Sequence, residues 1–269
     1  MPSIQLRVDA YIPFRKIVET MQEGGEIAHL VFSRNLVTLY SLDAEYVCRM
    51  QAEFYAVGDD DDVDTSIIFQ LSELHMYLRK HRKSNDEIFT FQIDATNQVS
   101  IHCNGSSLLL TPTDDNVTIA LPRTCTFKKW PHFDIDTVEL QTMFLEFAVA
   151  GATVELQIET NGDIKFSSYS DIGVVSVDSF NTPANKGVKW VKQPSKSFIS
   201  GPFIVKFLKL FHSLPVSSQY SRIFSDTSSM RIHCKISESC NFIFFIKEYT
   251  GPKGRVIDPT YVSVSTRCS

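Results

Sequence analysis

The sequence lacks the marks of several large protein classes. Its six cysteines are scattered and form no Cys-x-x-Cys pair, which favours a reduced, intracellular chain over a disulfide framework. No stretch approaches the roughly 18 apolar residues that a membrane-spanning helix needs. The first residues hold no apolar signal core. We therefore expect no signal peptide and no membrane partner.

The motifs of common enzyme classes are also missing. The sequence has no GxxxxGK[ST] phosphate loop, no HExxH metal-binding pair and no GxSxG nucleophile turn. A metal site built from His233, Cys234 and Cys240 is disfavoured, because neighbouring residues of a strand point to opposite faces. We predict a protein that is not an enzyme, with no catalytic residue, no metal and no cofactor.

The composition is that of a folded chain with a sizeable core. The 269 residues are 43% hydrophobic, with only 11 glycines and 11 prolines, which is enough to bury one large core or two medium ones. The formal net charge of −5 disfavours nucleic acid as a partner by total charge alone. How the charges are distributed therefore matters more than their sum.

One order of elements recurs along the chain. Apolar residues at helical spacing predict four helices, at residues 13–22, 71–83, 137–150 and 202–214. Each helix follows one strand-like segment and precedes three, so a strand–helix–strand–strand–strand unit occurs four times. Each helix has a single apolar stripe, so it should cover one face of a sheet and leave its own other face open. The pattern predicts an α+β fold.

Pairs of these units predict two similar domains. The domains would be residues 1–120 and 133–250, and a connector at residues 121–132 would join them. The connector has two prolines and no clean periodicity, as is typical of a linking segment. Residues 251–269 would form a C-terminal tail.

Cations gather on the open faces of three predicted helices, while acidic residues gather in loops. These cations are Arg15, Lys16, Arg79, Lys80, Arg82, Lys83, Lys206 and Lys209. Together they predict a surface for a polyanion such as duplex DNA, although for any one helix alone an ordinary solvated face is the favoured interpretation. The third helix breaks the pattern, because its open face offers Glu139, Thr142 and Glu146 and no cation.

Three stretches resemble the sliding clamps of the proliferating cell nuclear antigen (PCNA) family. They are IQLRVDAYIPFRKIVE, NLVTLYSLDAEYVCRM, and FLKLFHSLPVSSQYSRIFSDTSSMRIHCKI with the following FIFFIKEY. The chain is similar to a divergent member of that family, of a kind that a virus could encode. The resemblance implies the DNA-clamp fold, with helices on the inner face of curved antiparallel sheets, and a ring of three chains whose twelve helices face duplex DNA.

The function implied by the resemblance is that of a DNA polymerase processivity factor. Its partners would be double-stranded DNA without sequence preference, a DNA polymerase, other replication or repair proteins with clamp-binding peptides, a clamp loader, and two further copies of the chain. The location would be the nucleus or a viral replication site in a host cell. Alternatives are a subunit of a heterotrimeric checkpoint-type clamp, a viral processivity subunit that forms no ring, or a scaffold that has lost DNA binding.

The resemblance also implies a hydrophobic pocket for a partner's one-turn helix, which carries a glutamine, an aliphatic residue and two aromatics. The residues carried over to it are Leu42, Tyr46, Val47, Leu121, Trp130, Phe245 and Ile246. Without the resemblance, Leu42 and Tyr46 would read as plain core. Ring closure would use strand edges near residues 107–112 and 174–179.

Overall fold

The computed structural model describes most of the chain. The described residues are 3–33, 35–44, 47–58, 65–81, 89–103, 105–113, 127, 129–170, 173–180 and 187–249. Within these ranges, no helix combines the length and the apolar character that crossing a membrane requires. The predicted tail lies outside the described residues, as does most of the predicted connector.

The predicted order of strand, helix and three strands is present four times. The first unit comprises β1 (Ser3–Leu6), α1 (Tyr11–Gly24), β2 (Ile27–Ser33), β3 (Leu36–Leu42) and β4 (Cys48–Gly58). The second comprises β5 (Thr65–Gln70), α2 (Leu71–Lys80), β6 (Thr90–Ile93), β7 (Val99–Cys103) and β8 (Ser106–Leu109).

The third and fourth units repeat this order. The third comprises β9 (His132–Asp136), α4 (Thr137–Ala150), β10 (Thr153–Ile158), β11 (Ile164–Ser170) and β12 (Gly173–Phe180). The fourth comprises β14 (Phe198–Ile204), α5 (Val205–His212), β15 (Tyr220–Ser225), β16 (Ser229–Ser237) and β17 (Cys240–Lys247).

Two details differ from the sequence prediction. An additional strand, β13 (Val188–Lys192), pairs with β9. The fourth helix begins at Val205 rather than at Pro202, and Phe203 lies near the end of β14 instead of opening the helix. Phe203 pairs with Val154 of β10. The apolar run PFIVKFL gave no sign of this change from strand to helix, because both states bury Phe203.

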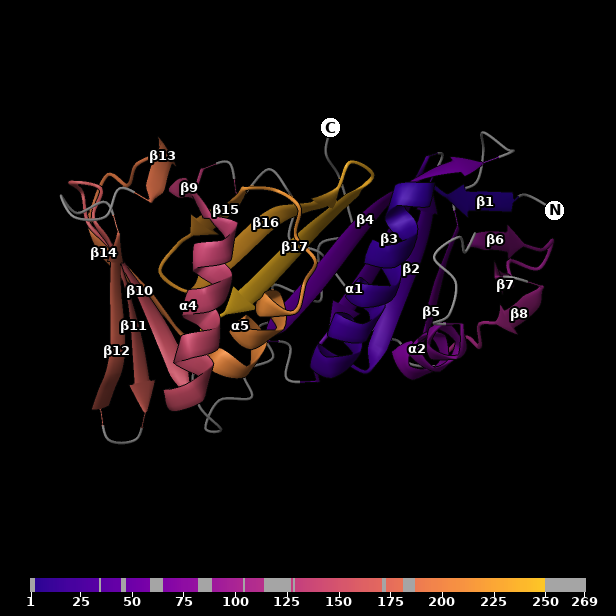
Figure 1. Ribbon diagram of the computed structural model, residues 1–269, viewed down its shortest axis with the longest axis horizontal. Coiled ribbons are helices and arrows are strands. Elements are labelled where there is room, and N and C mark those ends of the chain that lie inside the picture. The colour runs from indigo at the N-terminus through magenta and orange to yellow at the C-terminus, as the bar shows by residue number, and fades with distance from the viewer. Residues whose placement is uncertain are drawn as a thin grey trace, which may run out of the picture.

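The sheets are antiparallel and run through the junction of the two halves. Strand β17 pairs with β4 along seven residues, from Cys240 opposite Phe54 to Ile246 opposite Cys48. One sheet therefore follows the order β13-β9-β15-β16-β17-β4-β1-β6-β7-β8, with β2, β3 and β5 attached beside β4. A second sheet has the order β12-β11-β10-β14. Figure 1 shows the four helices in front of these strands, all on one side.

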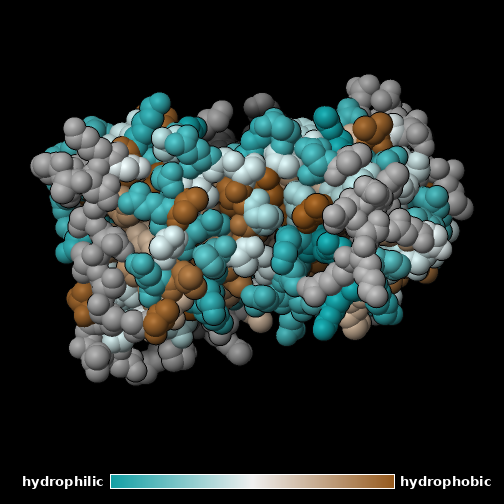
Figure 2. Space-filling view, viewed as in Figure 1, coloured by the Kyte–Doolittle hydropathy of each residue, from teal (hydrophilic) through white to brown (hydrophobic). Residues whose placement is uncertain are grey.

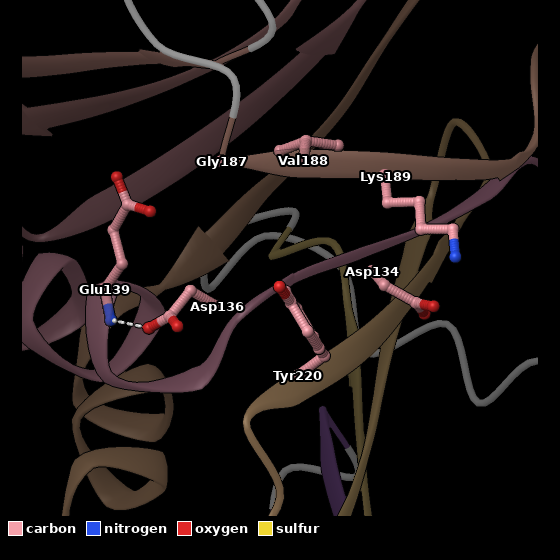
Figure 3. A pocket seen from close by; sticks show the side chains of 7 residues that line it. All are labelled: Asp134, Asp136, Glu139, Gly187, Val188, Lys189 and Tyr220. Carbon is pink, nitrogen blue, oxygen red and sulfur yellow. Dashed lines mark hydrogen bonds between the residues drawn. The ribbon is translucent and has the colours of Figure 1, made fainter.

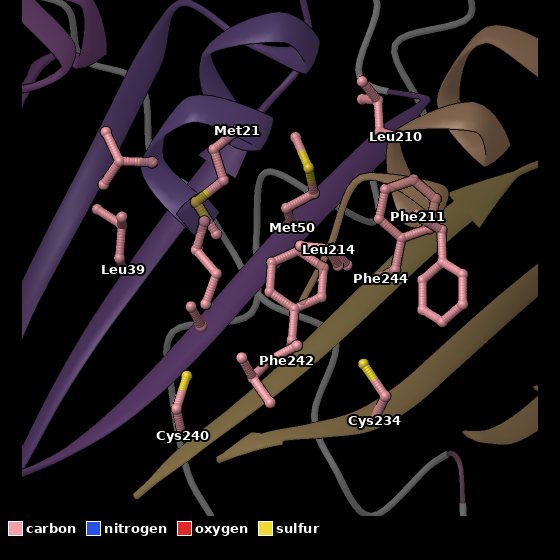
Figure 4. Close-up of a cluster of buried hydrophobic side chains, with 14 of the residues drawn as sticks. Met21, Leu39, Met50, Leu210, Phe211, Leu214, Cys234, Cys240, Phe242 and Phe244 are labelled. Carbon is pink, nitrogen blue, oxygen red and sulfur yellow. The ribbon is translucent and has the colours of Figure 1, made fainter. Parts of the chain in front are cut away.

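The core lies between the helices and the sheets. The apolar stripe of α1 consists of Phe14, Ile17, Val18 and Met21, and all four side chains are fully buried. At the junction of the halves, Met50 of β4 and Phe244 of β17 lie beneath Leu210 of α5 (Figure 4). Burying each such side chain contributes about 1.5–3 kcal/mol, so the helices are fixed to the sheet by their stripes.

Successive strand pairings define which residues share a face. On the helix side, one row runs across six strands through Ser41, Met50, Phe244, Ile232, Ile223 and Phe133. Every member of that row is at least 99% buried. Residues one position along each strand point to the opposite face, which is free of the four helices.

Candidate functional site

The open faces of α2 and α5 present four exposed cations. Arg79 and Lys80 lie in the last turn of α2, and Lys206 and Lys209 lie on α5. No ion pair of these four is recorded within the described ranges. Lys206 also lies over the ring of Phe207. Cations on two helices of the same side, with α1 between them, can bind phosphates without reading sequence.

The two cations of α1 are engaged within the protein. Lys16 is exposed and forms an ion pair with Glu19, with 2.9 Å between Nζ and Oε2. Arg15 is half-buried and donates from Nη1 to the carbonyl oxygen of His81, which follows α2, at 3.4 Å. Arg15 therefore helps to hold α1 against α2. The predicted cations Arg82 and Lys83 lie outside the described residues.

Helix α4 presents a different face. Its exposed positions include Val138 and Val149, at 70% and 84% exposure, together with Thr142 and Glu146. Figure 2 shows hydrophobic side chains along α4 on the helix side of the molecule. The exposed face of α4 therefore carries no lysine or arginine, as the sequence predicted.

A second surface lies on the side of the sheet away from the helices. Strand pairing places one row of side chains across six strands, and we call it the outer row. It consists of Leu42, Arg49, Phe245, Arg231, Phe224 and His132, on β3, β4, β17, β16, β15 and β9. Directly opposite residues of antiparallel strands interact side by side. From Arg49 to Phe224, the outer row therefore alternates arginines and phenylalanines across the junction of the halves.

Aromatic residues from the predicted connector cover this row. The Phe127 ring meets Phe245 edge-on at 5.9 Å and Trp130 edge-on at 4.7 Å between centroids. Arg231 lies over the Phe127 ring at 4.5 Å and over the Phe224 ring at 5.7 Å. Trp130 remains partly exposed beside them. An aromatic wall of this kind suits a peptide with apolar anchors.

The structure separates two residues that were predicted to share one pocket wall. Phe245 lies on the outer row, whereas Ile246 is fully buried in the core on the helix side. Adjacent residues of β17 point to opposite faces, so Ile246 is corrected to a core residue. Leu42 shares the outer row with Phe245, and Val47 packs against the core cluster at the start of β4. Tyr46 and Leu121 lie outside the described residues.

Phe127, Arg231, Phe224 and His132 were not among the predicted site residues. Phe127 lay in a segment without periodicity, and Arg231 looked like an ordinary polar residue of the alternating strand MRIHCKIS. A visible signal was the pair of arginines, Arg49 and Arg231, within two long and otherwise largely apolar strands. Both are largely buried, with 6% and 9% of their surfaces exposed.

Charges next to the outer row are set by burial and by one ion pair. Arg222 donates twice to Asp134, at 2.7 and 3.0 Å, and this bond raises the pKa of the guanidinium. Burial, then the charges of Arg231 and Arg222, lower the pKa of His233 to about 4, so this imidazole is neutral at pH 7. Burial lowers the pKa of Arg231 as well.

A hollow of about 470 Å³ lies where β9, β13 and α4 meet (Figure 3). Two of the three carboxylates that line it, those of Asp134 and Asp136, are engaged within the protein. Asp134 pairs with Arg222, and Asp136 caps α4 by accepting from the backbone N–H groups of Val138 and Glu139. No cluster of potential metal ligands occurs among the described residues. We therefore interpret the hollow as the region in which Asp136 caps the start of α4.

Among the strands that are paired on one side only, β8 ends one sheet and β12 ends the other, and the two lie at opposite ends of the molecule (Figure 1). In the described part of the chain, β8 pairs only with β7, and β12 pairs only with β11. Each presents an exposed apolar side chain, Leu109 on β8 and Val174 on β12. Unpaired edges of this kind are templates for pairing with another chain. Strand β8 overlaps part of the first edge that the resemblance implied, near residues 107–112, and β12 spans the second, near residues 174–179.

Comparisons with known proteins place the fold. No family model matches the sequence, and no curated protein sequence matches it significantly. A chain of the PCNA2–PCNA3 complex from Sulfolobus tokodaii aligns with a TM-score of 0.67 and 15% identity, over 92% of this chain and 98% of that one. The Proliferating Cellular Nuclear Antigen of Entamoeba histolytica aligns with a TM-score of 0.70 and 12% identity, over 92% and 99%. The chain has the fold of a PCNA-like sliding clamp.

Proposed function

We propose that the protein is a DNA sliding clamp that encircles duplex DNA and tethers a DNA polymerase to it. The observation that carries the proposal is the arrangement of four helices on one face of a sheet system whose two ends offer unpaired strands. A clamp needs no catalytic group. It acts by keeping a bound enzyme next to the template, which makes each rebinding event intramolecular.

Three copies would close a ring by pairing β8 of one chain with β12 of the next. Such head-to-tail contacts form a closed ring when their rotation closes. Backbone hydrogen bonds would then satisfy the unpaired sides of β8 and β12, and Leu109 and Val174 would lose their exposure to water. The likeness to clamp structures supports this arrangement.

The helix faces would then line the hole of the ring. Arg79, Lys80, Lys206 and Lys209 would supply sequence-independent attraction for the phosphates of double-stranded DNA. Lys16 would contribute less, because it is already paired with Glu19. The predicted contacts of Arg82 and Lys83 belong to the same proposal. Few and solvated contacts would let the ring slide.

Partner proteins would dock on the opposite side, over the outer row. The proposed groove includes Leu42, Phe245, Phe127 and Trp130, and it would take a short helical peptide with aliphatic and aromatic anchors. The polymerase, replication and repair proteins and a clamp loader would share this groove. The protein would work in a nucleus or at a viral replication site.

The first experiment is the mass in solution, by light scattering on a sizing column at low micromolar concentration. A homotrimer of the 30.5 kDa chain has a mass of about 90 kDa. A mass near 30 or 60 kDa would contradict the homotrimer.

A heteromeric clamp is the second candidate, and α4 is the observation that favours it. A homotrimer would place three copies of the apolar and acidic face of α4 in its hole, whereas partner chains could supply cations there. Co-purification of a second chain of similar fold, with a mass near 90 kDa only for the mixture, would support this candidate.

A further inference from the structure

The outer row holds two largely buried arginines, one on each side of Phe245. Arg49 of β4 and Arg231 of β16 are the direct neighbours of Phe245 in the strand pairing. The row on the opposite face of the same strands is apolar at the corresponding places. A groove for purely apolar anchors would need no cation at these positions, so the arginines call for an explanation.

Arg231 is the more informative of the two. It is 91% buried, and its Nε has no hydrogen-bond partner. Its recorded contacts are with the faces of Phe127 and Phe224. Glu53 acts on its pKa through charge alone, and no carboxylate within the described ranges forms an ion pair with it. A buried guanidinium is stabilised most by a carboxylate that accepts from its fork.

The surroundings are positive as well. Lys129, next to Trp130, is exposed, and Lys192 donates from Nζ to the carbonyl oxygen of Lys129 at 2.6 Å. The acidic Asp134 is already neutralised by Arg222. A carboxylate that entered beside Arg231 would therefore meet this guanidinium with aromatic rings on two sides, and Glu53 is the acidic charge that already acts on it.

We propose that the groove over the outer row selects partner peptides that place an aspartate or glutamate against Arg231, next to the aromatic anchor that packs on Phe127 and Phe245. The inference rests on the proposed partner groove and names the chemistry that the groove prefers. The recess favours a single side-chain carboxylate, because Arg231 is buried between rings and a continuous phosphate backbone needs an open path of cations.

The test compares two eight-residue peptides on the full chain. One has the sequence QEELEEFF, and the other, QQQLQQFF, replaces each glutamate by glutamine. Affinity is measured by calorimetry at low and high salt. We expect the glutamate peptide to bind at least about tenfold more tightly at low salt, and the difference to shrink as salt screens the pair.

Variants locate the preference. Arg231→Met keeps the length and apolar stem of the side chain and should abolish the difference between the peptides, whereas Arg231→Lys should retain part of it. Lys235→Met is the matched control, because Lys235 lies on the same strand and the same face, four residues away, and it should leave the preference unchanged. If Arg231→Met does not fold, the affinities of the two peptides for the unchanged chain still show whether the groove prefers acidic peptides.

The possible results distinguish a failure of the acidic preference from a failure of the partner groove. Equal binding of the two peptides, or tighter binding of the glutamine peptide, would overturn the acidic preference and leave the groove standing. If neither peptide binds, both proposals fall. If a DNA oligonucleotide displaces the glutamate peptide in the unchanged chain but not in a chain with Arg231→Lys, the anion site belongs to nucleic acid and the inference is overturned.

Discussion

The guanidinium of Arg231 lies 4.5 Å from the centre of the Phe127 ring. This contact fastens a residue of the predicted connector to β16, near the point where β17 and β4 join the two halves. Phe127 in turn meets Phe245 and Trp130 edge-on. One aromatic side chain thus links the connector, the outer row and the partly exposed indole of Trp130.

Phe127→Ala should expose Trp130 and loosen the groove. Losing a buried phenylalanine side chain costs about 3 kcal/mol, so the free energy of unfolding should fall by about that amount. The emission of Trp130 should shift to the red, because the indole loses its edge-on neighbour. A Trp190→Phe background removes the other tryptophan of the chain. Unchanged emission would show that Phe127 does not shield Trp130.

Removing cations from α2 and α5 should weaken DNA binding without changing the mass in solution. The double variants are Arg79→Gln with Lys80→Gln, and Lys206→Gln with Lys209→Gln. The affinity for DNA falls as the salt concentration rises, and each lost phosphate contact should make the plot of log affinity against log salt less steep by about 0.9. Lys165→Gln on β11, also exposed, is the control. If the control variant and the double variants weaken DNA binding equally, the faces of α2 and α5 do not form the DNA-binding surface.

A cation added to α4 should strengthen DNA binding if this helix also faces the duplex. Glu146→Lys changes an exposed position of α4 from acidic to basic, so both the affinity and its salt dependence should increase. The comparison variant is Glu238→Lys, at an exposed turn between β16 and β17. If the two variants gain equally, the gain reflects total charge and α4 does not line the hole.

A charge at either free edge should open the ring. Leu109→Lys on β8 and Val174→Lys on β12 would bring an ammonium group into the proposed contact between chains. Light scattering should show a mass near 30 kDa in place of about 90 kDa, with the thermal midpoint of the monomer retained. Val57→Lys makes the same kind of change on β4, inside the sheet. A trimer that survives both edge variants would place the interface elsewhere.

His233 should make the protein less stable as the pH falls from 6.5 to 4. The folded imidazole has a pKa of about 4, compared with 6.5 without its surroundings. Between these values the unfolded chain binds more protons, so the free energy of unfolding decreases on acidification, by roughly 2–3 kcal/mol from this residue. Urea unfolding at pH 7 and pH 4.5 should show a smaller decrease for His233→Gln than for the unchanged chain. An equal decrease would refute this assignment.

The sequence predicted the parts of the fold that depend on local periodicity. The stripes of all four helices are buried, including Leu140, Phe144 and Phe147 of α4, because a helix shows its buried face at regular spacing. The unit order followed from those stripes. The start of α5 was placed three residues early, since Phe203 is buried as a strand residue and fits the helical spacing as well.

The outer row could not be predicted in the same way. Its six members come from six strands, and Leu42 and His132 are far apart in the chain. Their shared face depends on strand register, which one sequence does not specify. The opposite directions of Phe245 and Ile246 do follow from strand alternation, and this simple rule would have kept Ile246 out of the predicted pocket wall.

The most direct test of the proposed function is whether the protein stays on DNA because it encircles the duplex. The protein is crosslinked to itself with an amine-reactive reagent in the presence of nicked circular DNA and then washed at high salt, which removes phosphate-dependent binding. A sliding clamp should stay with the circle and leave once a restriction enzyme cuts the DNA at one site. Release from the intact circle by salt alone would show that the protein does not encircle DNA.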